Sequence, residues 1–132
     1  RIAILEHGRI RQVGTPLQVY DEPQSIDVAQ RLGSPAINVL PASWFAGRAD
    51  PRALHVAIRP EDVVLSAAGG AQPCTVIECS LVKHLVVAEH MGVEVRARTM
   101  LDQALSPGDE VQLHFPAGRC LYFDASGRRL AA

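Results

Sequence analysis

The chain has 132 residues, 48% of them hydrophobic, and a formal net charge of -1. A chain of this length buries roughly two-thirds of its unfolded surface, enough for one core and an appendage. The lack of a strong basic charge argues against a nucleic-acid binder, and no apolar run approaches the ~20 residues that span a bilayer. Three cysteines, an odd number, argue against a disulfide framework and favour a reducing, cytosolic setting.

Residues 1–14 predict a β-hairpin, and the sequence indicates no further strand or helix to pack beneath it. The apolar run Ile2-Ala3-Ile4-Leu5 is followed by the turn Glu6-His7-Gly8 and a second strand over 9–13. An isolated hairpin is marginal in water, and the chain begins without Met. We therefore expect a remnant of a preceding domain. Its open edges and apolar side predict a homodimer with contacts from residues 1–33.

Residues 15–37 predict two short helices that act as a connector. Thr15 can cap the first helix and Pro16 fits its first position. The helix is expected to end at Glu22-Pro23, because a residue before proline avoids the helical region. Ser25 can cap the second helix.

From residue 38 onward, short strands and turns replace the helical signals. A flexible loop is expected over 67–73. Several short strands between turn signals predict a mainly β unit, a small sandwich or barrel. The expected strands cover 56–58, 63–65, 74–82, 85–89, 93–98, 111–115 and 121–123.

Cysteine and histidine residues in the middle of the chain invite comparison with a zinc site. Cys74, Cys79, His84 and His90 follow the spacing C-x4-C-x4-H-x5-H. Zinc requires four converging ligands. On a regular strand, however, residues 74 and 79 face opposite sides. We therefore expect no metal here, but small buried thiols and surface imidazoles.

The sequence offers no means of catalysis or nucleotide binding by itself. Neither a GxxxxGK[ST] phosphate loop nor a GxGxxG fingerprint occurs, and no Ser-His-Asp arrangement stands out. We therefore expect no catalytic residue and no cofactor in this chain.

The segment Arg59-Pro60-Glu61-Asp62 interrupts two strands. Proline fixes its own backbone angle and holds Arg59 extended. One interpretation is a bend with a surface ion pair between Arg59 and Glu61, worth under ~1 kcal/mol. The other is an inter-domain or inter-subunit contact. The small energy of exposed pairs favours the first.

Several short motifs follow one another along the chain. They are Arg1-Ile2-Ala3-Ile4-Leu5, Gln12-Val13-Gly14-Thr15-Pro16, Val19-Tyr20-Asp21-Glu22-Pro23, Leu32-Gly33-Ser34-Pro35, Asn38-Val39-Leu40-Pro41, Ile58-Arg59-Pro60-Glu61-Asp62 and Leu121-Tyr122-Phe123-Asp124. In this order they resemble the C-terminal portion of the ATP-binding subunits of ABC importers that serve sugars and glycerol 3-phosphate. The stretch over 58–62 resembles the signature of their TOBE domain.

The resemblance implies a remnant hairpin of an ATPase domain over residues 1–14, a helical linker over 15–37 and an OB-like TOBE barrel over 38–132. ATP and Mg²⁺ would bind in the parent ATPase domain. Permease subunits would contact that domain, at the cytoplasmic face of the membrane. The barrel would act as a regulatory and dimer-stabilising module that a cytosolic effector can bias. The candidate contact residues are Ser34, Pro35, Asn38, Arg59, Pro60, Glu61 and Asp62.

Two other functions stay open. Related barrels of oxyanion importers bind anions such as molybdate, which needs converging cations or backbone N–H groups; Arg96 and Arg98 share one strand face but are expected to face solvent. An OB barrel that binds nucleic acid uses stacked aromatic residues in a positive groove. With three Phe, two Tyr, one Trp and a negative charge, nucleic acid ranks last, and we expect no such partner.

Overall fold

The computed structural model of the chain describes residues 1–66, 72–98 and 105–130. Its contacts divide the chain into two compact units. Unit 1 is made of Arg1–Ile37, Pro41–Ala57 and Leu121–Ala132, and unit 2 of Asn38–Leu40 and Ile58–Cys120. The division into domains over 1–14, 15–37 and 38–132 stays a prediction.

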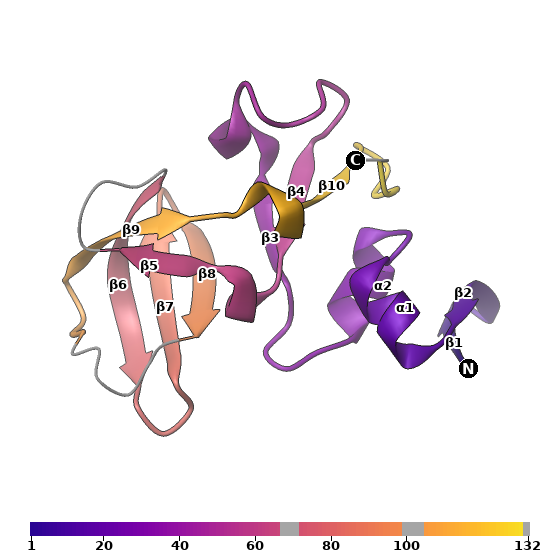
Figure 1. The fold of residues 1–132 in the computed structure, drawn as a ribbon, viewed down its shortest axis with the longest axis horizontal. Coiled ribbons are helices and arrows are strands. Elements are labelled where there is room, and N and C mark those ends of the chain that lie inside the picture. Colours follow the sequence, from indigo (N-terminus) through magenta and orange to yellow (C-terminus); the bar gives the residue numbers. More distant parts are fainter. Residues whose placement is uncertain (67–71, 99–104, 131–132) are drawn as a thin grey trace. The chain divides into compact units, whose positions relative to one another are not determined.

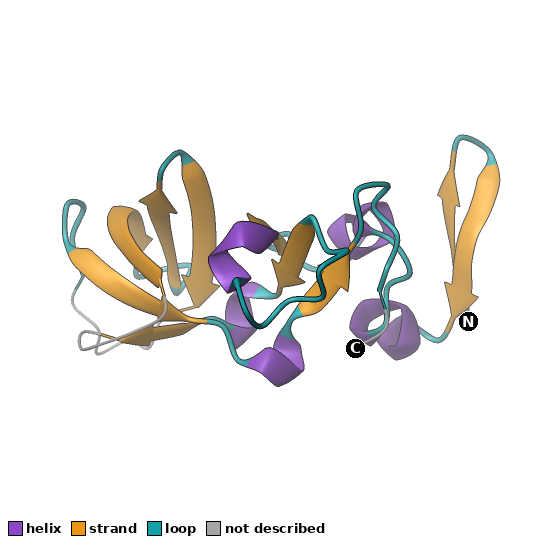
Figure 2. Ribbon diagram, turned by 90° about the horizontal axis from the view of Figure 1, so that it is seen from above, coloured by secondary structure: helices purple, strands orange, loops and turns teal. Residues whose placement is uncertain are grey.

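Unit 1 begins with the predicted hairpin. Strands β1 (Ile2–Glu6) and β2 (Arg9–Gly14) pair antiparallel, and the described residues place no third strand beside them (Figure 2). The turn residues His7 and Gly8 both have positive φ, +50° and +76°. Two-residue turns of this kind match the twist of the flanking strands.

One face of this hairpin is apolar and exposed. Ala3 pairs with Val13 and Leu5 with Ile10, and the side chains of Leu5, Ile10 and Val13 are 55%, 62% and 45% exposed. The opposite face carries the pair Ile4 and Gln12, of which Gln12 is buried. The hairpin is thus anchored on one face and open on the other.

Two short helices follow, as the capping residues predict. Helix α1 (Pro16–Asp21) begins after Thr15, whose Oγ1 accepts a hydrogen bond from the Gln18 N–H at 3.1 Å. Helix α2 (Ile26–Arg31) begins after Ser25, whose Oγ accepts from the Val28 N–H at 3.2 Å. In the part of the chain that the structure describes, no helix is long and apolar enough to cross a membrane.

The rest of unit 1 comes from segments far apart in the sequence. Strand β4 (His55–Ile58) pairs antiparallel with β10 (Leu121–Phe123), which aligns Val56 with Tyr122. Phe123 is fully buried. The 3₁₀ helix η1 (Ala42–Phe45) precedes β4. Strand β3 (Asn38–Pro41) comes before η1, and its residues 38–40 are assigned to unit 2.

Unit 2 contains a five-stranded antiparallel sheet in the order β5-β9-β6-β7-β8, which curls into a half-barrel (Figure 1). This confirms the predicted mainly β, OB-like class. Short 3₁₀ helices η2 (Pro60–Asp62) and η3 (Ala117–Arg119) flank it. The strands are β5 (Val64–Ser66), β6 (Gln72–Ser80), β7 (Leu85–His90), β8 (Val93–Arg98) and β9 (Glu110–His114).

Alternation along the strands builds the core of unit 2, as the sequence predicts. Val111 and Leu113 are buried whereas His114 is exposed, and Val95 is buried between exposed Glu94 and half-buried Arg96. Successive side chains of a strand point to opposite faces, so one face packs and the other meets water.

Two expectations about β6 are wrong at its ends. The strand was expected over 74–82, but it ends at Ser80 and residues 81–84 form a turn, in which His84 has a positive φ of +52°. Of the loop expected over 67–73, residues 67–71 lie outside the described residues, whereas Gln72 and Pro73 belong to β6. Pro73 is tolerated because β6 pairs with β7 only from Thr75 onward, so no N–H is required on that side.

The loop after η1 holds an exposed ion pair. Arg52 Nη2 lies 2.9 Å from Asp50 Oδ2, and the Arg52 backbone N–H donates to Asp50 Oδ1 at 2.8 Å. The hydrogen bonds from the side chain and backbone of Arg52 hold the pKa of the Asp50 carboxyl at about 2. Solvent screening keeps the effect of such a pair on stability small.

We expect the Arg52→Gln substitution to return the pKa of Asp50 from about 2 toward its ordinary value of 3.8. A folded-state pKa below the unfolded value means that the pair stabilises the fold above the unfolded pKa. That contribution is lost as the pH falls through the folded pKa. NMR titration of the carboxyl carbons measures the shift. Arg48→Gln, which removes the guanidinium over the Phe45 ring, should leave Asp50 unchanged, and an ordinary Asp50 pKa in the wild type would contradict the pair.

Candidate functional site

Asn38, a predicted contact residue, satisfies the open edge of the five-stranded sheet. Its Nδ2 donates to the Arg96 carbonyl at 2.8 Å, and its Oδ1 accepts from the Arg96 N–H at 2.8 Å. Among the described residues, β8 is the last strand of its sheet, and no further strand there pairs with these backbone groups. One buried amide, 5% exposed, supplies both a donor and an acceptor to them.

The segment Arg59–Asp62 lies beside the same strand, because η2 packs against β8. Arg59 is extended, as predicted, and it is buried with only 5% of its surface exposed. Pro60 is also buried, whereas Glu61 is exposed. The Asp62 N–H donates to the Arg59 carbonyl at 2.9 Å, and Asp62 Oδ1 lies 3.9 Å from Arg119 Nε.

The structure therefore brings Asn38 and the 59–62 segment together on β8. Ser34 and Pro35 belong to unit 1, the first exposed and the second half-buried, and they are joined by a cis peptide bond. Whether any of these residues contacts a partner stays a prediction. Arg59 and Pro60 are both buried.

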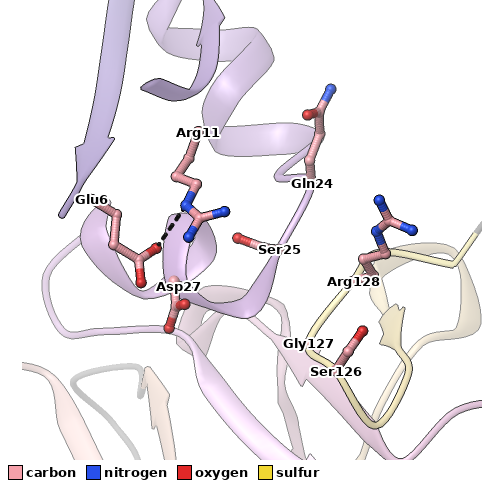
Figure 3. Close-up of a pocket in the computed structure, with 8 residues that line it drawn as sticks. All are labelled: Glu6, Arg11, Gln24, Ser25, Asp27, Ser126, Gly127 and Arg128. Carbon is pink, nitrogen blue, oxygen red and sulfur yellow. Dashed lines mark ion pairs between the residues drawn. The ribbon is translucent and has the colours of Figure 1, made fainter. Parts of the chain in front are cut away.

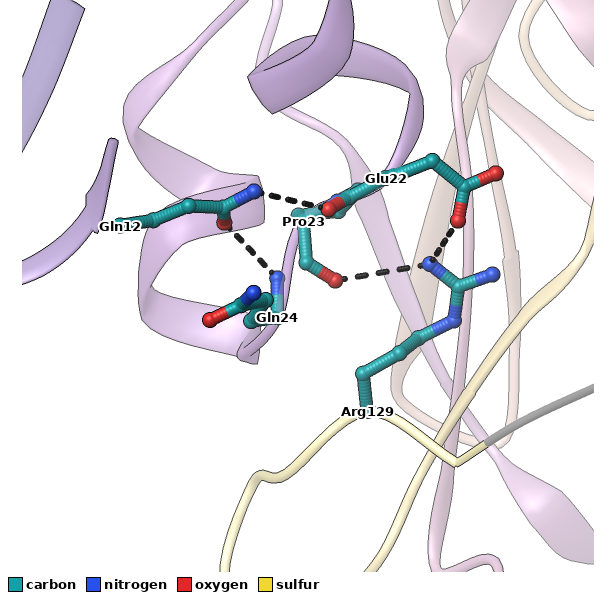
Figure 4. A network of polar contacts seen from close by, with 5 residues as sticks. All are labelled: Gln12, Glu22, Pro23, Gln24 and Arg129. Atoms are coloured by element: carbon teal, nitrogen blue, oxygen red, sulfur yellow. Dashed lines mark hydrogen bonds and ion pairs between the residues drawn. The ribbon is translucent and has the colours of Figure 1, made fainter. Parts of the chain in front are cut away.

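A second buried amide, Gln12, bonds one backbone carbonyl and one backbone N–H in unit 1, as Asn38 does in unit 2. Its Nε2 donates to the Glu22 carbonyl at 2.9 Å, and its Oε1 accepts from the Gln24 N–H at 2.9 Å. These bonds join the hairpin to the junction between the two helices (Figure 4). The sequence motifs include Gln12 but do not predict this role. A polar residue on the inward face of a strand is the feature that could have indicated it.

Arg129 extends this network to the other end of the chain. Its Nη1 lies 3.2 Å from Glu22 Oε2 and donates to the Pro23 carbonyl at 3.5 Å (Figure 4). The Arg129 N–H also donates to the Gln24 carbonyl at 2.8 Å. The helix junction is thus held from both sides, by β2 and by the C-terminal segment.

The expectation that Cys74 and Cys79 face opposite sides is wrong. The register of β6 against β7 shifts between Val76 and Glu78, and this bulge inserts an extra residue. Val76 then pairs with Ala88 and Cys79 with Val86, so Cys79 lies on the same face as Cys74.

The bulge does not assemble a metal site among the described residues. Within them, no group of three or more His, Cys, Asp or Glu side chains lies close enough to hold an ion. Burial raises the pKa of the Cys74 thiol to about 11, so the thiolate that a metal requires is disfavoured at neutral pH.

The two arginines considered for oxyanion binding lie on β8 as expected. Arg96 is half-buried, and its Nη2 lies 3.6 Å from Glu94 Oε1 on the same strand face. Arg98 is exposed. The Glu94 carboxylate partly neutralises the positive charge of Arg96, so this strand face is poorly suited to bind an anion.

A family model described as the TOBE domain matches residues 56–123, just over half of the chain. The matched stretch takes in Arg59–Asp62, η2 and the whole five-stranded sheet. This agrees with the resemblance that the sequence motifs indicate.

Curated relatives match almost the whole chain. The sn-glycerol-3-phosphate import ATP-binding protein UgpC of Rhizobium meliloti (strain 1021) is 35% identical over 98% of the chain and 42% of its own length. The sulfate/thiosulfate import ATP-binding protein CysA of Xanthomonas campestris pv. campestris is 36% identical over 100% and 38%. The lactose transport ATP-binding protein LacK of Rhizobium radiobacter is 29% identical over 98% and 44%. The chain thus spans about two-fifths of the length of these relatives.

Removal of the Asn38 amide tests its bridge to β8. Asn38→Ala leaves the Arg96 N–H and carbonyl without their partner, which we expect to lower the free energy of unfolding by about 1–3 kcal/mol. Urea denaturation measures this loss, and faster hydrogen exchange at the Arg96 amide should accompany it. Gln30→Ala, an exposed amide on α2, should change stability by less than about 0.5 kcal/mol. Equal effects of the two substitutions would contradict the bridge.

Proposed function

Because the chain belongs to the TOBE domain family, and its relatives are import ATP-binding proteins, we propose that it is the non-catalytic regulatory and dimerisation module of an ABC importer ATP-binding subunit. The observation that carries the proposal is the match over nearly the whole chain to about two-fifths of such proteins. The ATP and Mg²⁺ sites would lie in the rest of the subunit, since the sequence has no phosphate loop.

The proposed solute is a sugar or glycerol 3-phosphate. Relatives named for glycerol 3-phosphate and lactose support this choice, although one named for sulfate and thiosulfate matches equally well. The permease subunits would contact the ATPase domain, at the cytoplasmic face of the membrane. The alternative function is that of an oxyanion-binding module. Arg96 gives it little support, because the Glu94 carboxylate lies beside the Arg96 guanidinium.

The module would act mechanically on the ATPase domain. The hairpin is bonded through Gln12 to the helix junction, and Arg129 ties that junction to the C-terminal segment. In this proposal, a displacement of the hairpin would be transmitted through these hydrogen bonds to chain segments more than a hundred residues away. An effector that binds one arrangement of the hairpin, the helix junction and the C-terminal segment more tightly than another would shift the equilibrium toward that arrangement.

The apolar face of the hairpin supplies the contact with another surface. Leu5, Ile10 and Val13 are about half exposed, and among the described residues no third strand pairs with either strand of the hairpin. Apolar area and unpaired edges of this kind favour association. In the isolated chain the partner is a second copy, which gives the homodimer. In a complete subunit the ATPase domain would compete for the same face.

Sedimentation velocity tests the homodimer. We expect the wild-type chain to sediment as a dimer at high concentration and Leu5→Asp as a monomer, because a charge on the apolar face opposes burial. Val82→Asp alters a side chain that is 91% exposed in the turn after β6, so this control should dimerise like the wild type. A wild-type monomer at every concentration would rule out the dimer.

A chimera tests the module in a working importer. The matched part of the Rhizobium meliloti relative is replaced by this chain, and glycerol 3-phosphate uptake is measured in cells that lack that relative. We expect uptake by the chimera, reduced by the combined changes Gln12→Ala and Arg129→Ala, and no ATP hydrolysis by the isolated chain. Hydrolysis by the isolated chain, or a stable chimera without uptake, would overturn the proposal.

A further inference from the structure

A polar hollow of about 370 Å³ lies within unit 1, at a place where three distant segments meet (Figure 3). The hairpin, the start of α2 and the turn before Arg129 all contribute to its lining. The side chains that matter are Glu6, Arg11, Ser25, Asp27, Ser126 and Arg128. Two are basic, two are acidic and two carry hydroxyl groups, so the formal charge of the lining is balanced.

One of the two basic groups is partly neutralised. Arg11 Nε lies 3.4 Å from Glu6 Oε2, and the Glu6 side chain is only 17% exposed (Figure 3). This pair leaves the terminal amino groups of Arg11 as donors toward the hollow. Glu6 therefore orients Arg11, and the remaining charges belong to Arg128 and Asp27.

Those two charged side chains keep hydrogen-bonding groups for a ligand. In the part of the chain that the structure describes, neither the Arg128 guanidinium nor the Asp27 carboxylate makes a hydrogen bond or ion pair, although both line the hollow. The nearby Asp124 carboxylate, whose pKa is lowered by the hydrogen bond from the Ser126 side chain and in smaller part by the charge of Arg128, partly offsets that charge. A guanidinium presents five N–H donors and binds phosphate or carboxylate oxygens in pairs. A carboxylate only accepts, so it suits hydroxyl donors.

Each of the two serine hydroxyls makes one hydrogen bond within the protein and can make another with a ligand. Ser25 Oγ already accepts from the Val28 N–H, so its proton can be donated. Ser126 Oγ donates to Asp124 Oδ1 at 2.6 Å, so its lone pairs can accept. The hollow thus offers donors at Arg11, Ser25 and Arg128 and acceptors at Asp27 and Ser126.

We propose that this hollow binds a small hydroxylated anion, one phosphate or carboxylate group on a short polyol. Arg128, with Ser25, would hold the anionic group, and Asp27 would accept hydrogen bonds from the hydroxyl groups. A bare anion fits less well because Asp27 repels it. A neutral sugar fits less well too, because the described residues that line the hollow include no aromatic side chain on which a sugar ring could stack.

Such a ligand would act as an effector, a role that rests on the proposed function. It would bridge α2 and the C-terminal turn, and reach Arg11 on the hairpin. These are the segments that the network of Gln12 and Arg129 also joins. The ligand would stabilise one arrangement of the three only if it binds that arrangement more tightly.

Binding is tested on the 132-residue chain by NMR titration and calorimetry with glycerol 3-phosphate, glycerate, inorganic phosphate and glycerol. We expect saturable binding of at least one of the first two, which separates the phosphate source from the carboxylate source, and weaker binding of the last two. Arg128→Gln should weaken binding at least about tenfold, the loss of one charge-assisted hydrogen-bond pair. Arg9→Gln, an exposed hairpin arginine outside the hollow, should leave binding unchanged.

Asp27→Asn separates the two roles in the hollow. It should strengthen inorganic phosphate binding by removing the repulsion and reduce the advantage of the hydroxylated ligands. No binding of any hydroxylated anion, or equal binding by wild type and Arg128→Gln, would overturn the proposal. Because binding needs no ATPase domain, a negative result here leaves the chimera experiment intact, and a failed chimera leaves the binding result intact.

Discussion

Backbone N–H and carbonyl groups at strand edges and chain junctions must find partners when they are buried, and in this chain two amide side chains provide them. Asn38 bonds both backbone groups of Arg96 on the last strand of the sheet. Gln12 bonds the Glu22 carbonyl and the Gln24 N–H between two helices. An amide suits both places because it donates and accepts at once. The five-stranded sheet and the helix junction both depend on this constraint.

The same bonds fix the positions of two short helices. Helices of six residues have little stability of their own, so their positions depend on tertiary contacts. Gln12 ties the junction to the hairpin, and Arg129 ties it to the C-terminal segment. The polar hollow lies where the hairpin, the start of α2 and the C-terminal turn meet.

Local signals in the sequence predicted much of the fold. The Thr15 and Ser25 caps, the helix end at Glu22-Pro23 and the strict alternation around Val95 and Val111 all depend on neighbours close in sequence, and the structure confirms them. The β6 bulge carried no such signal. It brings Cys79 onto the face of Cys74, because pairing with β7 fixes the register and not the composition of β6 alone.

The sequence by itself determined the β-rich class, the capped helices and the family motifs, since these follow from short-range geometry and residue type. Only the tertiary structure decided that Arg59 is buried and that Gln12 holds a helix junction. It also decided that Arg11, Asp27 and Arg128 line one hollow. Those facts depend on contacts between residues far apart in the chain, and no local pattern encodes which distant backbone group a side chain will meet.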